Sequence, residues 1–225
     1  RFDIITNPGA RYEAEGNAGI INIRLKKDKS LGANANVNLG YSVGELPQYN
    51  GAASANYRNK SLNAFGSYRY SDGYNTNFMY LYREQFGFTL DQTGNQGGHW
   101  QSHGFKAGTD FFLNKKNTVG FMIDGNVSDN LWGGASRTLI GTKGVEAIDS
   151  ILIASTEDRS DRNNFNFNLN YRFDDGEGQV WNIDADYGLF RNDGENYQPN
   201  RYVDPTGETV LLERINRMHT PTDID

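Results

Sequence analysis

The chain of 225 residues contains no cysteine and carries a formal net charge of −6. The lack of cysteine excludes disulfides, thiolate metal sites and cysteine nucleophiles, and the dispersed basic residues form no stripe for binding nucleic acid. Glycine is abundant, with 26 residues, and aromatic residues reach 13%, which favours strands and turns over helices. No apolar run approaches the ~18 residues of a transmembrane helix, but a membrane β-barrel remains compatible because its inner face is polar.

The first 29 residues combine turn signals with one short apolar strand. Pro8-Gly9 predicts a turn, and Gly16 and Gly19 permit positive φ angles or close backbone approaches. Ile20–Ile23 is apolar on both faces, as expected of a strand inside a packed core. These residues alone are equally compatible with a plain strand-turn-strand element of a soluble protein.

From Leu31 to Val43, apolar and small residues alternate with Asn, Gly and Ser. This period of two predicts a strand with one apolar and one polar face. It is longer than the usual 5–6 residues of soluble proteins and long enough for the ~9–11 residues that cross a bilayer. The same alternation predicts six further strands, at residues 53–58, 62–71, 105–113, 119–127, 164–173 and 181–189.

The connections between these strands differ in length. Short turns are expected at residues 58–61, 113–117 and 173–178, whereas residues 72–102, residues 129–162 and the tail from Asn192 are expected to form long loops. Short periplasmic turns alternating with long extracellular loops are typical of an up-and-down transmembrane β-barrel. Aromatic residues near the predicted strand ends match the interfacial girdles of such barrels. A soluble β-sandwich and a complete small eight-stranded barrel remain the alternatives.

The opening stretch also resembles a known family. Residues 5–23, followed by Lys26-Lys27, are similar to the end of the plug domain of TonB-dependent outer-membrane receptors, most of all the outer-membrane β-barrel branch common in Bacteroidetes. Thr6-Asn7-Pro8 stands where the wider family usually has Arg-Gly-Pro, which fits that branch. The residues that carry the plug motif, in structural roles, are Asn7, Pro8, Tyr12, Gly16, Gly19 and Asn22.

The resemblance implies an all-β protein with two parts. Residues 1–29 would be the C-terminal end of the plug domain, and residues 30–225 the first strands and extracellular loops of an antiparallel barrel that members of this family build from 22 strands. It further implies a receptor in the bacterial outer membrane that imports a scarce ligand, such as a siderophore, glycan or peptide. A TonB-type energy-transducing complex would drive import through a region upstream of Arg1. Outer-membrane lipid would surround the barrel, and a surface lipoprotein or other complex subunits are further partners.

Few residues predict chemistry. The sequence has no nucleophile elbow, phosphate-binding loop or HExxH motif, so we expect neither an enzyme nor a cofactor. His99 and His103 lack a third ligand, so no metal site is expected. Exposed aromatic side chains beside Arg or His can grip a ligand, or else pack loop on loop or join the girdle. The candidate ligand-binding residues in the predicted loops are His99, Trp100, Trp132, Arg137, Tyr197, Arg201 and Tyr202.

Two other classes of function remain open at this point. A non-transporting outer-membrane scaffold or adhesin would share the strands but need no plug. A soluble binding module with a β-sandwich fold would require a second sheet to cover the apolar face of residues 31–43.

Overall fold

The computed structural model describes residues 2–5, 20–23 and 31–225 and divides the chain into two compact units, residues 1–32 and 33–225. In the first unit, β1 (Phe2–Ile5) pairs antiparallel with β2 (Ile20–Ile23), and Asn22 lies opposite Asp3. The other plug-motif residues, Asn7, Pro8, Tyr12, Gly16 and Gly19, lie outside the described residues. The predicted boundary at residues 29 and 30 falls close to this division, and the plug itself stays a prediction.

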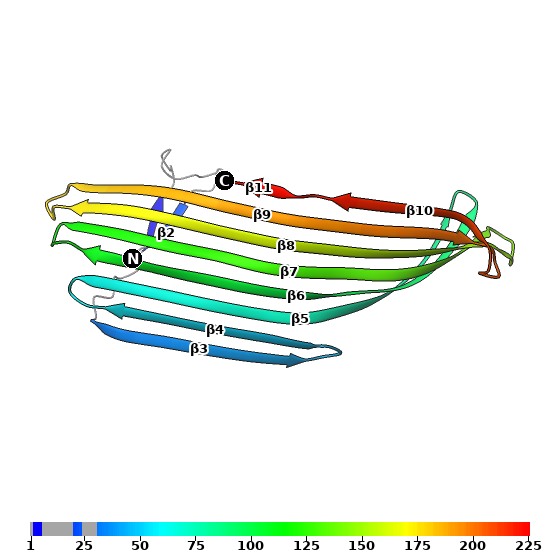
Figure 1. Ribbon diagram of the computed structural model, residues 1–225, viewed down its shortest axis with the longest axis horizontal. Coiled ribbons are helices and arrows are strands. Elements are labelled where there is room, and N and C mark those ends of the chain that lie inside the picture. Colours follow the sequence, from blue (N-terminus) through cyan, green and yellow to red (C-terminus); the bar gives the residue numbers. More distant parts are fainter. Residues whose placement is uncertain (1, 6–19, 24–30) are drawn as a thin grey trace. The chain divides into compact units, whose positions relative to one another are not determined.

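The second unit is one sheet in which each strand from β3 to β9 is hydrogen-bonded to the next strand along the chain (Figure 1). The pairings from β4 to β10 are antiparallel, as predicted for an up-and-down meander. Within the described residues every regular element is a strand, and none forms a helix long and apolar enough to span a membrane. The strands are β3 (Gly32–Val43), β4 (Pro47–Arg58), β5 (Leu62–Gln85), β6 (Phe88–Phe112), β7 (Asn117–Thr142), β8 (Ile148–Asp174), β9 (Val180–Val203), β10 (Val210–His219) and β11 (Thr222–Ile224).

The last two strands are two pieces of one edge strand. Both pair with β9, and the register continues across the break, with His219 opposite Glu195 and Thr222 opposite Asn192. Pro221 lies at the break, where its missing N–H cannot join the ladder. The sheet therefore has β3 at one edge and β10 with β11 at the other.

Each of the three predicted short turns is closed by an Asn or Asp side chain. The Asn59 Oδ1 atom accepts hydrogen bonds from the backbone N–H groups of residues 61 and 62, both at 2.8 Å. Asn114 caps the next turn in the same way, with two bonds of 2.9 Å. Asp175 accepts from three successive N–H groups, at 2.8, 3.1 and 2.9 Å. Such side chains replace backbone partners in tight turns.

The predicted long loops are wrong. Residues 72–102 are the second half of β5, a two-residue turn at Phe86-Gly87 and the first part of β6. Residues 129–162 continue β7 and β8, and the tail from Asn192 continues β9 before returning as β10. In these stretches both faces carry mainly polar residues and glycine, so the hydrophobic alternation fades although the backbone ladder continues. The strands therefore reach 24–27 residues from β5 to β9.

Strand register assigns every side chain to one of two faces. One face, called the banded face below, carries Leu62, Phe111, Val119, Tyr171 and Ile183, which lie directly opposite one another from β5 to β9. All the predicted apolar rows from β5 to β9 fall on this face, so the predicted alternation is confirmed there. The other face, called the amide face, carries Asn63, Asp110, Gly120, Asn170 and Asp184 in the adjacent row.

A conventional hydrophobic core is small in the described part of the chain. The buried apolar residues are Ile151 and Val203, which pair across β8 and β9. Most large apolar side chains of the banded face stay exposed, Leu39 to 86% and Trp181 to 63%. Residues 33–225 form one sheet, so this unit does not itself supply the second sheet that a soluble sandwich would require.

Candidate functional site

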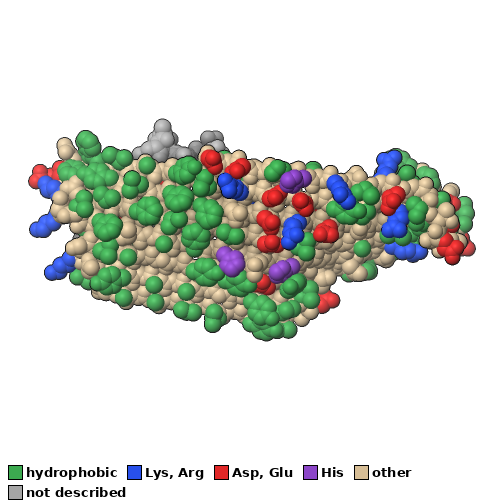
Figure 2. Space-filling view, in the orientation of Figure 1, with side chains coloured by type: hydrophobic (Ala, Val, Ile, Leu, Met, Phe, Trp, Pro, Cys, Tyr) green, Lys and Arg blue, Asp and Glu red, His purple; other side chains and the backbone are tan. Residues whose placement is uncertain are grey.

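The banded face begins with an apolar band next to the three capped turns. The band spans seven residues in β6 and nine in each of the other four strands, and it ends at nearly the same depth in all five (Figure 2). Inside it, the rings of Phe105 and Phe165 meet at 6.0 Å over Gly125 of the intervening strand, where a Cβ atom would lie 2.8 Å from both rings. The band comprises Leu62–Tyr70, Phe105–Phe111, Val119–Val127, Phe165–Phe173 and Trp181–Leu189.

A charged belt follows directly after the apolar band on the same face, and Figure 2 shows its acidic and histidine side chains at mid-length of the sheet. One row across five strands reads Asp72, Gln101, Asp129, Asp161 and Asp193, each opposite the next. Polar contacts continue at neighbouring positions. Arg191 Nε lies 3.2 Å from Asp223 Oδ1, and His219 Nε2 lies 2.6 Å from Asp193 Oδ1.

The acidic row is electrostatically unfavourable in itself. Partial burial and the hydrogen-bonded carboxylate of Asp129 raise the pKa of Asp161, while the positive charge of Arg159 opposes this shift. Like charges directly opposite one another on neighbouring strands are destabilising. Acidic side chains lie opposite one another on successive strands although this arrangement destabilises the sheet. At this level of the sheet, stability is therefore not what determines the choice of residues.

Tyrosine and histidine side chains lie at the border between band and belt on β5 and β6. The Tyr68 hydroxyl is 2.6 Å from His103 Nδ1, and Tyr70 donates to Asp72 at 3.0 Å. Tyr74 stacks on His99 with ring centroids 4.4 Å apart. The apolar ring carbons of these residues lie beside the band, and their polar atoms bond to side chains at the border with the belt. Aromatic residues have the same arrangement at membrane–water interfaces.

The amide face is polar at the depth of the apolar band. The Asn166 side chain donates to Asp124 at 3.0 Å, and Asn168 donates to Asp186 at 2.7 Å. Asn170 in turn donates to Asn168 at 2.9 Å. Each strand at this level therefore presents an apolar face and a polar face.

The seven predicted ligand-binding residues lie on strands rather than loops, and strand register separates them into two groups. Trp100, Trp132 and Tyr202 belong to the amide face. Those on the banded face engage neighbours there: His99 stacks on Tyr74, Arg201 lies 3.7 Å from Glu213, and Tyr197 lies under the Arg217 guanidinium at 4.8 Å. The banded-face residues are His99, Arg137, Tyr197 and Arg201. The two groups face opposite sides of the sheet, so the seven residues cannot form one site.

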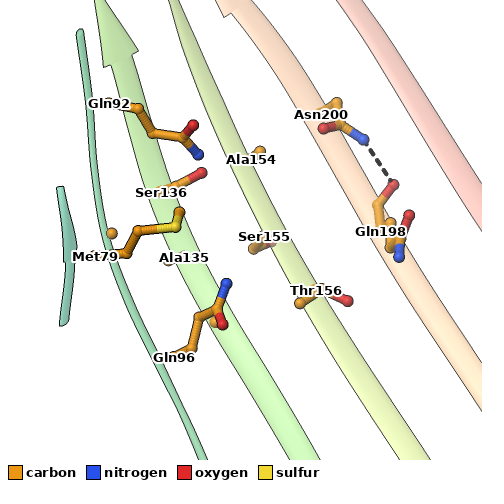
Figure 3. Close-up of a pocket in the computed structure, with 12 residues that line it drawn as sticks. Met79, Gln92, Gln96, Ala135, Ser136, Ala154, Ser155, Thr156, Gln198 and Asn200 are labelled. Carbon is orange, nitrogen blue, oxygen red and sulfur yellow. Dashed lines mark hydrogen bonds between the residues drawn. The ribbon is translucent and has the colours of Figure 1, made fainter. Parts of the chain in front are cut away.

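A hollow on the amide face was not singled out from the sequence (Figure 3). It lies beyond the level of the belt, and uncharged amide and hydroxyl side chains from β6 to β9 surround a floor of small residues. Gln92, Gly94, Gln96 and Gly98 alternate along β6 and are the sequence signal that could have revealed it. The polar lining residues are Gln92, Gln96, Ser136, Thr156, Gln198 and Asn200.

The chain matches no protein-family model, and no curated protein matches its sequence. Function is therefore inferred from the residues and their geometry. Within the described ranges, no group of three or more His, Cys, Asp or Glu side chains is arranged to hold a metal ion.

Proposed function

We propose that the second unit is part of the wall of a TonB-dependent receptor in the bacterial outer membrane, which takes up a scarce ligand through a plugged β-barrel. The observation that carries this proposal is the apolar band. It begins beside the capped turns, stays in register across five strands and ends at the charged belt.

The depth of the band fits a bilayer. About nine residues at ~3.4 Å each give ~31 Å of strand, and a tilt of ~40° reduces this to ~23 Å along the membrane normal. Outer-membrane barrels carry an apolar band ~25 Å tall. An amphipathic strand in a soluble protein has no reason to change from apolar to charged at one common depth.

The two borders of the band also fit membrane interfaces. The turns on one side carry lysines, including Lys60, Lys115 and Lys116, which suit a water-exposed rim. The other border has the Tyr68, Tyr70 and Tyr74 rings with their histidine partners. In this proposal, lipid covers the banded face up to the belt, the strands continue outside the membrane, and the amide face lines the lumen.

The open edges of the sheet support a larger assembly. Unpaired strand edges cannot face lipid, because their N–H and C=O groups would have no partners. Further strands must therefore join β3 on one side and the β10–β11 edge on the other. The receptor role itself follows from the resemblance of residues 5–27 to a plug end. Energy transduction through a region before Arg1, a lipoprotein partner and the absence of catalysis are part of the same proposal.

The first experiment uses the parent protein in its native membranes. The outer membrane is separated from soluble and inner-membrane fractions, and the protein is run on a denaturing gel with and without boiling. We expect it in the outer membrane, with a heat-dependent mobility shift at a size well above that of this chain. A shift at about the size of this chain would point to a small complete barrel. A soluble protein without a shift would refute the membrane assignment.

Transport is tested separately from membrane insertion. Deleting the energy-transducing protein of the host should abolish ligand uptake while the barrel stays in the outer membrane. Uptake that persists, or a protein that binds at the surface without any uptake, would favour the scaffold or adhesin alternative.

A further inference from the structure

We propose that a partner protein adds an extended segment, as a further strand, to the free edge of β5 at residues 75–85. The inference rests on the proposed function, which supplies the orientation of the strands and their depth in the membrane. It concerns a protein that docks on the outside of the wall, and not the ligand that the receptor takes up.

β5 continues far past its neighbour on one side. β4 begins at Pro47, and its register with β5 ends where Gln48 lies opposite Gly73. From there β5 runs on to Gln85, and among the described residues it is paired with β6 alone. Figure 1 shows β5 extending beyond the end of the β3–β4 hairpin. Residues 75–85 are called the free edge below.

The hydrogen-bond pattern determines which backbone groups of the free edge lack partners. On the β4 side, the Asn59 N–H donates to the Leu62 carbonyl at 2.8 Å, and on the β6 side the Phe112 N–H donates to the Ser61 carbonyl at 2.9 Å. In an antiparallel ladder these two directions alternate along the strand, and the β5–β6 register runs without a shift to Gln85. The even-numbered residues therefore direct their N–H and C=O groups away from β6. Beyond β4 these residues are Thr76, Phe78, Tyr80, Tyr82 and Glu84.

The side chains of the free edge also lack cover. Phe78, Tyr80 and Tyr82 lie on the banded face beyond the charged belt and are 66%, 60% and 51% exposed. Their partners on β6 offer no large apolar side chain, since they are Asn95, Thr93 and Asp91. A strand added on the open side would bring apolar neighbours to these three rings, and such cross-strand pairs stabilise a sheet.

Proteins usually shield an exposed edge with charges, proline or bulges. The opposite edge of the sheet has such devices in β10, where Glu213, Arg214 and Arg217 are charged and the register shifts after Val210. Residues 75–82 of the free edge contain neither a charged residue nor a proline. A long, uncharged and aromatic edge of this kind is a template for pairing with another chain.

The occupant is a segment of another protein for two reasons. A wall strand that joins β3 would lie three strand spacings, or ~14 Å, from β5, so it cannot pair with the free edge. A second copy would pair antiparallel about a two-fold axis, which would turn one barrel upside down in a shared membrane. Backbone hydrogen bonds supply affinity in strand addition, and alternate side chains supply specificity. The segment that fits is uncharged, with apolar residues at every second position to lie beside Phe78, Tyr80 and Tyr82.

The test uses the full-length parent protein in living cells, with photoreactive p-benzoylphenylalanine in place of Phe78. Irradiation should crosslink it to one other protein, and mass spectrometry identifies the crosslinked segment. Thr76→Pro removes a free N–H but no bond to β6, so the strand should persist, as proline does at edges. The crosslinked fraction should fall at least ~fivefold, because the ring leaves the added strand without a donor. The matched control Thr76→Ala keeps the N–H and should leave the fraction unchanged.

Hydrogen exchange gives a second readout on the unmodified protein. In isolated outer membranes nearly all amides of residues 75–85 should exchange slowly, because both edges of the strand are paired. After purification in detergent as a single polypeptide, about half of them, those directed away from β6, should exchange fast. Fast exchange of that half in native membranes as well would overturn the proposal.

Each variant is first checked for its heat-dependent mobility shift, so that misfolding is not mistaken for lost docking. No crosslink, or a crosslink that Thr76→Pro leaves unchanged, would overturn strand addition even if the protein proves to be an outer-membrane barrel. A crosslink to a second copy or to another part of the same chain would overturn the partner assignment. A protein outside the outer membrane that still gives a proline-sensitive crosslink to another protein would refute the membrane proposal and support the docking edge.

Discussion

The apolar band leads to a prediction about where an arginine is tolerated. Ile123 lies at the middle of the band in β7, between Ala107 and Phe167 of the neighbouring strands. Met122, the preceding residue, lies at the same depth on the amide face. Leu131 is on the banded face but in the charged belt, eight residues further along the strand, which is ~20 Å along the membrane normal for a strand tilted by ~40°.

An arginine at the midplane of a lipid-facing strand costs ~2–4 kcal/mol, and this cost falls to ~0–1 kcal/mol near the interfaces. We therefore expect Ile123→Arg to be destabilised by ~2–4 kcal/mol relative to Ile123→Ala, because the guanidinium would face hydrocarbon. Leu131→Arg relative to Leu131→Ala should lose at most ~1 kcal/mol. Met122→Arg relative to Met122→Ala should also lose little, since that arginine would face a hydrated lumen. The alanine references remove the loss of packing from each comparison.

The assay is the free energy of unfolding of the full-length protein in phospholipid vesicles, followed by tryptophan fluorescence during guanidinium titration. If the band faces lipid, the loss of unfolding free energy is larger for Ile123→Arg than for Met122→Arg at the same depth. It is also larger than for Leu131→Arg, which lies on the same face at another depth. Equal losses for Ile123→Arg and Met122→Arg would show that the faces do not differ in environment. Equal losses for Ile123→Arg and Leu131→Arg would remove the depth limit and with it the membrane interpretation.

Three further predictions concern the parts of the sheet outside the band. Phe86 has a φ of 53° in the two-residue turn of the β5–β6 hairpin, a position where Asn is favoured. Phe86→Asn should therefore raise the free energy of unfolding by ~1 kcal/mol. A decrease would show that the exposed ring packs favourably. The pKa of Asp161 is raised in the folded protein, so stability falls as pH rises through the window between its unfolded and folded pKa values. Asp161→Asn should therefore raise the unfolding midpoint at pH 7 and have no effect at pH 3. An equal gain at both pH values would exclude charge as the cause. Hydrogen bonds from Thr206 and from the backbone of Thr209 and Glu208 lower the pKa of Asp204 to about 2, so this carboxylate stabilises the hairpin above its unfolded pKa and loses that effect as pH falls toward 2. Asp204→Ala should accordingly speed hydrogen exchange in the 204–209 turn at pH 7, and unchanged exchange would contradict the capping role.

Where hydrophobic alternation was strong, the sequence predicted the fold well. Residues 62–71 and 164–173 alternate, and apart from Phe65 their apolar and tyrosine residues fall on one face. The three short turns were also predictable, because Asn59, Asn114 and Asp175 are the residue types that close tight turns with their own side chains. Both the alternation and the turn-closing residues depend on neighbours in the sequence, so the sequence alone reveals them.

The extended halves of the strands could not be predicted in the same way. In residues 72–102 both faces are mainly polar, and a stretch such as Asn95-Gln96-Gly97-Gly98 has the composition of a loop. Only pairing to two neighbours makes it a strand, and that information lies in β5 and β7 rather than in β6 itself. The candidate site was misjudged for the same reason. In a loop, His99 and Trp100 could converge on one ligand, whereas in a strand they must face opposite sides.

This separation gives the long strands a functional meaning in the proposed receptor. A strand that ended at the charged belt would cross the membrane, but its amide face would offer only the polar side chains found at band depth, such as Asn166 and Asn168. Continuing the same ladder past the belt keeps Trp132, Thr156 and Gln198 at fixed spacing on neighbouring strands. Side chains held by a sheet lose less entropy on binding than side chains on mobile loops. A rigid wall outside the membrane is therefore better suited than flexible loops to hold side chains at fixed positions for binding.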